Sequence, residues 1–213
     1  MGVVIINPNS TASMTDAMVE VARASAPELS FDGWTSENGP PAIQGFEDGK
    51  AAAPHLLELV RKASNAGADG IIIGCFDDTA LSQAAALASC PVIGIGHATF
   101  HFSALRNWRF SVVTTMPASV PVIEGNIADF GLTGFSSKVR ASHVPVLDLE
   151  NAADASEGLV VEEAKRAEAE DDVDAVILGC AGMVTLSHRV EAALSKTVLD
   201  PVSVSASCMK WLV

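Results

Sequence analysis

Residues 68–75 read ADGIIIGC, and residues 173–180 read VDAVILGC. Each stretch is a short run of Val, Ile and Leu that ends in Gly-Cys, and near-continuous apolar runs of this kind are typical of strands buried on both faces of a parallel sheet. The two stretches match position by position, so Cys75 and Cys180 are equivalent residues separated by 105 positions. The pattern predicts an α/β fold with one cysteine at the end of each strand.

Other landmarks repeat in the same order. Pro8 and Pro117 follow matching β-rich runs 109 residues apart, and residues 91–94 (PVIG) are echoed 106 residues later by residues 197–200 (TVLD). Any two buried parallel strands look alike, which is the plainer explanation, but strand composition does not account for two equivalent cysteines. We therefore predict a duplicated α/β lobe, so that the two lobes are pseudo-symmetric.

The repeat also indicates how the chain is divided. We expect residues 1–97 to form the first lobe and residues 98–202 the second, with residues 203–213 packing back on the first. Ligands of open α/β sheets bind beyond the carboxyl ends of the strands, so both cysteines should face a cleft between the lobes. The expected strands are residues 3–6, 70–74, 91–95, 110–114 and 174–179, and the expected helices are residues 12–25, 52–66, 80–88 and one from about residue 120.

The composition is that of a compact, acidic globular protein. Hydrophobic residues make up 49% of the 213 residues, enough apolar surface to offset the entropy lost on ordering. With 26 acidic against 13 basic side chains, the formal net charge of -13 repels nucleic-acid phosphates and anionic lipids. No apolar run approaches the roughly 20 residues that span a bilayer. We expect a cytoplasmic protein that binds neither nucleic acid nor membrane.

The four cysteines contain no C-x-x-C pair, so neither a zinc ribbon nor a thioredoxin motif is indicated. Cys90 and Cys208 have no counterpart in the repeat and are interpreted as small buried hydrophobic residues. A facing pair formed by Cys75 and Cys180 suits the inversion of a stereocentre with an acidic hydrogen, because a base must remove a proton from one face while an acid returns one to the other. A thiol pKa of about 8.5 allows one partner to be a thiolate while the other stays protonated. Each cysteine also precedes a predicted helix start, and we expect the N–H groups there to stabilise the thiolate.

The carbanion formed by proton removal needs hydrogen-bond donors where its negative charge develops, usually on a carbonyl oxygen. Asn9 and Ser10 in one turn, and Thr114 and Thr115 in another, follow predicted strands that face the same cleft. These residues are candidate substrate ligands. For Asn9 and Ser10, capping of the next helix is an equally good explanation, and one residue can do both.

Five motifs, taken in order, resemble the aspartate/glutamate racemase superfamily and specifically its hydantoin and allantoin racemase branch. They are INPNST (6–11), GPPAIQG (39–45), IIIGCFDD (71–78), FSVVTT (110–115) and VILGCAGM (176–183). The resemblance extends from Val3 to about Asp200. It implies two similar α/β lobes with parallel four-stranded sheets flanked by helices, an active site in the cleft between them, assembly into homo-oligomers, and no metal or pyridoxal phosphate.

The resemblance also carries residue roles. It implies that Cys75 and Cys180 are the catalytic pair. The substrate-binding residues that we expect are Asn9, Ser10, Phe76, Asp77, Thr114, Thr115, Ala181, Gly182 and Met183, with Pro41 and Ile43 as loop contacts. Amino-acid racemases of the superfamily resemble C-N-T and C-T at their cysteines, whereas Phe76 and Ala181 follow the cysteines here, and this departure favours a ring-shaped, less charged substrate.

Three other features need interpretation, and two of them allow two explanations. Asp77 and Asp78 either orient the substrate or complement a helix dipole. His97 and His101 lie one helical turn apart, which is the start of a metal site, but histidines beside aromatic residues are more often core or interface, and we expect no metal. The acidic stretch near residues 162–172 is most simply a solvated helix face.

These observations predict a cofactor-independent racemase of a small carbon acid, most simply a 5-substituted hydantoin or allantoin. The alternatives are an amino-acid racemase, an arylmalonate-type decarboxylase, a maleate-type cis-trans isomerase, or a small-molecule binding protein on the same scaffold. Decarboxylases of that kind resemble single-thiol enzymes and an isomerase would use one cysteine as nucleophile, whereas a binding protein has no use for two acid-base thiols.

Overall fold

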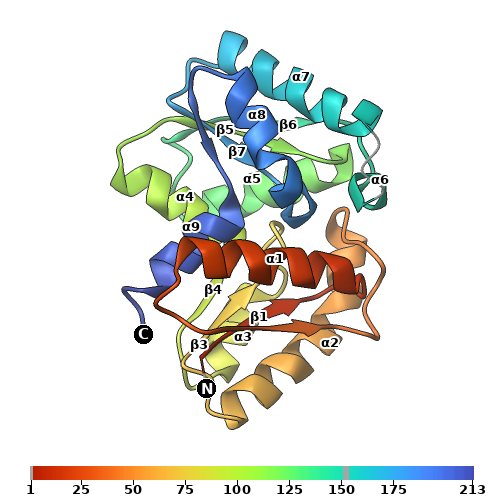
Figure 1. Cartoon of the computed structure of the whole chain (residues 1–213), viewed down its shortest axis with the longest axis vertical. Helices are drawn as coiled ribbons and strands as arrows, with labels where there is room; N and C mark the ends of the chain where they lie inside the picture. Colours follow the sequence, from red (N-terminus) through yellow and green to blue (C-terminus); the bar gives the residue numbers. More distant parts are fainter. Residues whose placement is uncertain (1, 151–153) are drawn as a thin grey trace.

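The computed structural model describes residues 2–150 and 154–213. Two sheets of four parallel strands, each flanked by helices, form two lobes stacked along the long axis of the molecule (Figure 1). The first sheet has the order β2-β1-β3-β4, from β1 (Val3–Asn7), β2 (Phe31–Thr35), β3 (Gly70–Ile73) and β4 (Val92–Gly94). The second has the order β6-β5-β7-β8, from β5 (Phe110–Thr114), β6 (Ser136–Ala141), β7 (Ala175–Leu178) and β8 (Thr197–Leu199).

The helices connect the parallel strands, as crossovers must. Those of the first half are α1 (Ala12–Ser25), α2 (Phe46–Asn65), α3 (Leu81–Leu87) and α4 (Ile95–Leu105). Those of the second half are the 3₁₀ turn η1 (Pro117–Ser119), α5 (Val120–Asp129), α6 (Val146–Glu150), α7 (Asp154–Glu170), the 3₁₀ helix η2 (Ala181–Leu186), α8 (Ser187–Ala193) and α9 (Pro201–Met209). Within the described ranges, no helix has the length and apolar character needed to cross a lipid bilayer.

The predicted fold class is confirmed, and the repeat is visible in the topology. Both sheets have the same order of strands. The strands within residues 68–75 and 173–180 are β3 and β7, and both are fully buried at the same place in their sheets. The edge strands β2 and β6 are absent from our expectation because the exposed polar residues of an edge strand break the apolar run that marks a buried one.

Helix α2 begins six residues earlier than predicted. Pro54 lies inside it, and a proline there suggests a helix start because its ring has no N–H to donate. The structure instead begins the helix after Gly45, which has a φ of 115°. The Asp48 carboxylate accepts a hydrogen bond from the Gln44 N–H at 3.0 Å, which ties the preceding loop to the first turn.

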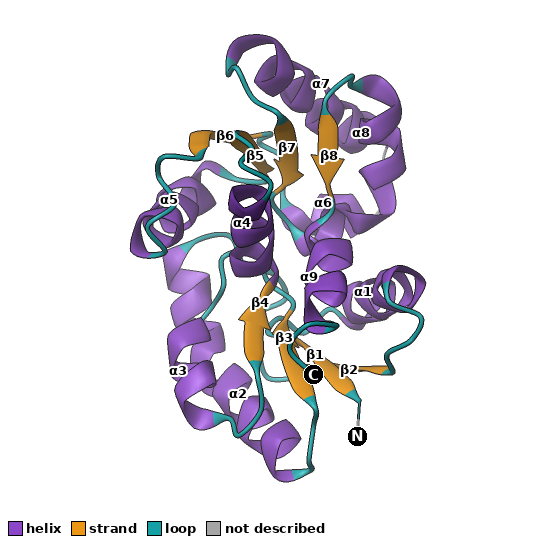
Figure 2. Ribbon diagram, turned by 90° about the vertical axis from the view of Figure 1, so that its left-hand side faces the viewer, coloured by secondary structure: helices purple, strands orange, loops and turns teal. Residues whose placement is uncertain are grey.

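One hydrophobic core is shared by the two lobes. Phe100 on α4 packs against Phe76 of the first lobe, with ring centroids 5.3 Å apart, and against Phe110 of the second, at 5.6 Å. Helix α9 returns from the second sheet and contacts both α1 and α4 (Figure 2). The boundary expected at residue 97 falls inside α4, and the division of the chain at that point stays a prediction.

A buried ion cluster closes the outer side of the second sheet. Arg140 on β6 donates its Nε–H to the Asp171 Oδ2 atom at 2.6 Å, and the two side chains are 6% and 5% exposed. Ser111 on β5 donates to the same carboxylate at 2.7 Å. Burial opposes ionisation of Asp171, but the hydrogen bonds from Arg140 and Ser111 lower its pKa overall.

Arg140→Met should destabilise the protein by about 3–5 kcal/mol, because it leaves the Asp171 charge buried without its partner. The double variant Arg140→Met/Asp171→Asn removes that charge and should recover part of the loss. Unfolding in urea, followed by circular dichroism, measures both. A loss below about 1 kcal/mol in the single variant would show that the cluster behaves as a surface ion pair.

Candidate active site

The carboxyl ends of β3 and β7 deliver the two equivalent cysteines to one pocket. Cys75 follows β3 of the first lobe and Cys180 follows β7 of the second. Predicted residues that line this pocket are Asn9, Ile43, Cys75, Phe76, Asp77, Thr114, Thr115, Cys180, Ala181 and Gly182. We call it the thiol pocket. Its volume is about 20 Å³, which is room for one water molecule, so the open cleft expected between the lobes stays a prediction.

Cys75 lies among groups that act on its charge in opposite directions. Burial raises the pKa of its thiol well above the ordinary value, and the Asp77 carboxylate and the Cys180 sulfur raise it further. The Thr79 hydroxyl donates to the Cys75 Sγ atom at 3.6 Å and lowers the pKa. Charge on one thiol therefore disfavours charge on the other.

The expectation that a helix start stabilises the Cys75 thiolate is wrong for this state of the molecule. A turn of five residues separates Cys75 from α3, so no helix N-terminus is next to the sulfur. Cys180 does adjoin a helix, because it is the residue before the first turn of η2. It packs with Met14, Ala42 and Val146, which come from both lobes.

Asp77 is the second ionisable group of the pocket and is only 8% exposed. Burial raises its pKa to about 7, and the charge of Asp48 acts in the same direction, against hydrogen bonds from the Gly45 N–H and the Ser119 hydroxyl. The Ser119 Oγ atom lies 3.4 Å from its carboxylate, and Asn126 donates to its backbone carbonyl at 2.8 Å. Since Ser119 and Asn126 belong to the second lobe, Asp77 joins the two lobes.

Asp78, by contrast, is structural. Its Oδ1 atom accepts the Gly96 N–H at 3.1 Å, so it caps α4, the helix after the neighbouring strand β4, and does not complement α3. Burial raises its pKa well above the ordinary value, and its Oδ2 atom has no hydrogen-bond partner among the described residues. A neutral carboxyl group fits this position.

The turn between β1 and α1 is held by a buried amide network. Asn7 donates to the Asn9 Oδ1 atom at 2.9 Å, and the same oxygen accepts the Thr11 N–H at 2.9 Å. Asn9 thus orders the turn before α1 and also lines the pocket. It does not cap α1, because the N-cap residue is Thr11 and no side chain caps this helix, and its contact with substrate stays a prediction. Thr114 donates its hydroxyl to the Gly179 carbonyl at 3.0 Å, which ties β5 to the residue before Cys180.

Three predicted residues lie near the pocket without lining it. Ser10 is half-buried and donates its N–H to the Pro40 carbonyl at 2.9 Å. Pro41 is exposed, and its carbonyl accepts the Thr11 hydroxyl at 2.8 Å. Met183 is buried in the core of the second lobe.

The two histidines form an aromatic cluster on α4. Their ring centroids are 4.5 Å apart, and both rings contact Phe130. Burial lowers the pKa of His97 to about 4, with the charge of His101 in support. Among residues 2–150 and 154–213, no three His, Cys, Asp or Glu side chains are placed to hold a metal ion.

Residues 3–209 match the family model described as Asp/Glu/Hydantoin racemase. The chain belongs to this racemase family. A hydantoin racemase of Rhizobium meliloti is 38% identical over the whole chain and 88% of that protein. The structure of allantoin racemase from Klebsiella pneumoniae matches 99% of this chain and 86% of that one, with 34% identity and a TM-score of 0.91. For allantoin racemase from Pseudomonas fluorescens the identity is 29% and the TM-score 0.92, over 99% and 89% of the chains.

Five further residues line the thiol pocket and were not predicted from the sequence. They are Met14, Gly74, Ser119, Val146 and Gly179. The repeat held a signal for two of them. Ser119 follows Ser10 by the same 109 residues that separate the two turn prolines, and Val146 follows Pro41 by 105, the spacing of the cysteines. The second lobe therefore supplies counterparts of the first lobe's turn and loop.

Asp77→Asn should reduce the dependence of stability on pH. Because the folded pKa is raised from 3.8 to about 7, the stability that protonated Asp77 contributes is present below pH 4 and is lost as the pH rises through 7. The variant has no such loss. Between pH 5 and pH 8 the wild type should therefore lose more unfolding free energy than the variant, by about 3 kcal/mol at most. Parallel urea-unfolding curves at the two pH values measure this difference. Parallel pH dependence in the two proteins would contradict the prediction.

Proposed function

We propose that this chain is a cofactor-independent racemase of a 5-substituted hydantoin or of allantoin, with Cys75 and Cys180 as the two proton-transfer groups. The observation that carries the proposal is that two thiols at equivalent positions of a duplicated lobe line one pocket. The relatives named above, whose names include hydantoin or allantoin, support the substrate class.

The proposed step moves one proton off the stereocentre and another onto it. The thiolate of one cysteine takes the hydrogen of C5 and becomes a thiol, while the electron pair spreads over the adjacent ring carbonyl. The other thiol then delivers its proton to the opposite face and is left as the thiolate, so the enzyme holds the same charge in a mirrored arrangement. The first N–H groups of η2, beginning at Ala181, are suited to stabilise the oxyanion.

Asp77 affects which thiol carries the charge. Because its negative charge raises the pKa of Cys75, the neutral acid favours the Cys75 thiolate and is also able to donate a hydrogen bond to a ring carbonyl. A hydantoin ring is much larger than one water molecule, so the lobes must separate before it enters the thiol pocket.

Wild-type protein should racemise a single enantiomer of a 5-substituted hydantoin or allantoin in D₂O, with loss of optical rotation and deuterium at C5 above a no-enzyme background. Cys75→Ser and Cys180→Ser should each lower the racemisation rate by about 10²–10⁴-fold. Cys90→Ser is the matched control, because Cys90 packs on the outer core of the first lobe, and it should leave the rate unchanged.

Polarimetry gives the racemisation rate and NMR gives the deuterium content. Full activity in either serine variant would exclude a two-thiol mechanism. No exchange with any of these compounds would exclude the substrate class. CO₂ release from an arylmalonate or isomerisation of maleate would then identify one of the other chemistries.

A further inference from the structure

The repeat is broken at one buried position close to the thiols. The offset of 105 residues between Cys75 and Cys180 makes Thr79 the counterpart of Val184, and each of these two residues is followed two positions later by a leucine. Both side chains are buried, at 6% and 5% exposed. The first lobe therefore has a hydroxyl group at a position where the second lobe has a methyl group.

The Thr79 hydroxyl is directed at the first thiol. It donates to the Cys75 Sγ atom at 3.6 Å, and the Asp77 N–H is a second donor to the same sulfur. Donors bind a thiolate more strongly than a neutral thiol, and both contacts lower the pKa of Cys75. Because Cys75 and Thr79 lie four residues apart in one lobe, their contact does not depend on how closely the lobes approach.

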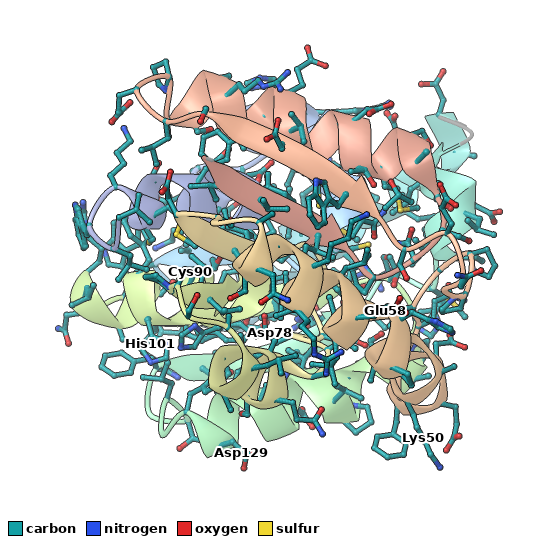
Figure 3. All side chains as sticks on the ribbon, turned by 90° about the horizontal axis from the view of Figure 1, so that it is seen from below. Lys50, Glu58, Asp78, Cys90, His101 and Asp129 are labelled. Atoms are coloured by element: carbon teal, nitrogen blue, oxygen red, sulfur yellow. The ribbon has the colours of Figure 1, made fainter. Side chains whose placement is uncertain are left out.

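A strained turn places Thr79 beside the sulfur. Its neighbours Asp78 and Ala80 both have positive φ values, which cost energy for residues other than glycine. Asp78 lies near the centre of the molecule in Figure 3 and is only 6% exposed. Its contact with the Gly96 N–H, at 3.1 Å, offsets part of this cost. Contacts outside the turn thus hold the conformation that brings the hydroxyl to Cys75.

The two thiols differ in what favours a negative charge on them. Cys180 is the N-cap residue of η2, where the helix dipole and the first N–H groups favour an anion. Helix α3 begins only at Leu81, so Cys75 has no helix start beside it. Burial and the Asp77 carboxylate oppose a charge on Cys75. The Thr79 hydroxyl acts in the opposite direction.

We propose that Thr79 is a positioning residue for proton transfer, whose hydroxyl donates to Cys75 while that sulfur is negatively charged. This inference rests on the proposed function, in which each thiol carries the charge in turn. Without the hydroxyl, the charge stays on Cys180 in a larger fraction of the enzyme. The titratable groups that act on Cys75 are Asp77 on its own turn and Cys180 from the second lobe, and Asp48 on α2 acts on Asp77.

The first test measures the charge on Cys75 without a substrate. Iodoacetamide alkylates thiolates, so the pH midpoint of its reaction with Cys75 in the Cys180→Ser background, followed by peptide mass spectrometry, reports that charge. Thr79→Val keeps the shape of the side chain and removes the hydroxyl, so it should raise the midpoint by about 0.5 to 1. Thr79→Ser keeps the hydroxyl and should restore the wild-type midpoint.

Thr99→Val is the matched control. It removes a hydroxyl that is equally buried but donates to the Ile95 carbonyl on α4, at 2.7 Å. This variant should leave the midpoint of Cys75 unchanged, which separates the loss of one particular hydrogen bond from the loss of any buried hydroxyl.

The second test uses the kinetic constants of the two enantiomers of one hydantoin. Enantiomers are equally stable, so kcat/KM is the same for both, and Thr79→Val should lower it about three- to tenfold. For the enantiomer that gives its hydrogen to Cys75, KM should rise, because fewer enzyme molecules carry that thiolate. For the other enantiomer, kcat should fall, because negative charge develops on Cys75 in the transition state. Deuterium exchange in Cys180→Ser identifies the first enantiomer, since Cys75 is the thiol that remains.

The outcomes separate this inference from the proposed function. An unchanged midpoint in Thr79→Val, or no recovery in Thr79→Ser, would overturn the role of Thr79 while racemisation by the wild type upholds the proposed function. The same division of the loss between KM and kcat for both enantiomers would also overturn the positioning role, since a general loss of structure acts on both alike. A raised midpoint in a protein that racemises neither hydantoins nor allantoin would overturn the proposed function and leave only the hydrogen bond.

Discussion

The packing of Phe100 between Phe76 and Phe110 is the contact on which the rest of the structure depends. Phe100 lies on α4, the helix that connects the two sheets, and its ring touches one aromatic residue from each lobe. Phe76 directly follows Cys75, so the same side chain that joins the lobes also fixes the backbone next to the first thiol. Each copy of a duplicated lobe has an apolar face that must be buried. The shared core buries both faces, because each lobe covers the face of the other.

Burial of this kind has an electrostatic consequence at the site. The strand ends that carry the cysteines are the part of each sheet nearest the other lobe, and they bring Asp77 and Asp78 into the interior with them. Isolated carboxylates are costly to bury, so both acids have raised pKa values. Asp78 offsets part of the cost of its burial by capping α4, and this contact orders the turn that follows Cys75. Asp77 has contacts with both lobes, to Gly45 of the first and to Ser119 and Asn126 of the second.

The sequence predicts those features of this arrangement that depend on short local patterns of residues. The buried strands β3 and β7 are visible as apolar runs, and each run ends in Gly-Cys. The repeat then identifies the two cysteines as equivalent residues. The environment of Cys75 was not predictable in the same way, because it is set by contacts between distant segments. Asp78 and Ala80 adopt positive φ values of 47° and 52°. Such a turn is held only because Asp78 reaches the N-terminus of α4, where Gly94 and Gly96 leave room for its carboxylate.

The contacts that close the thiol pocket are weak compared with the core behind it. Across the mouth, Gln44 accepts the Val146 N–H at 2.9 Å and Ser119 lies 3.4 Å from the Asp77 carboxylate, while the aromatic core and α9 join the lobes on the other side. These two contacts, the hydrogen bond from Asn126 to the Asp77 carbonyl and the small apolar cluster around Cys180 oppose a much larger continuous apolar interface. Separation of the lobes should therefore open the mouth and leave the core closed. Because the Ser119 contact involves the Asp77 carboxylate, the charge of that carboxyl group is coupled both to opening and to the pKa of Cys75.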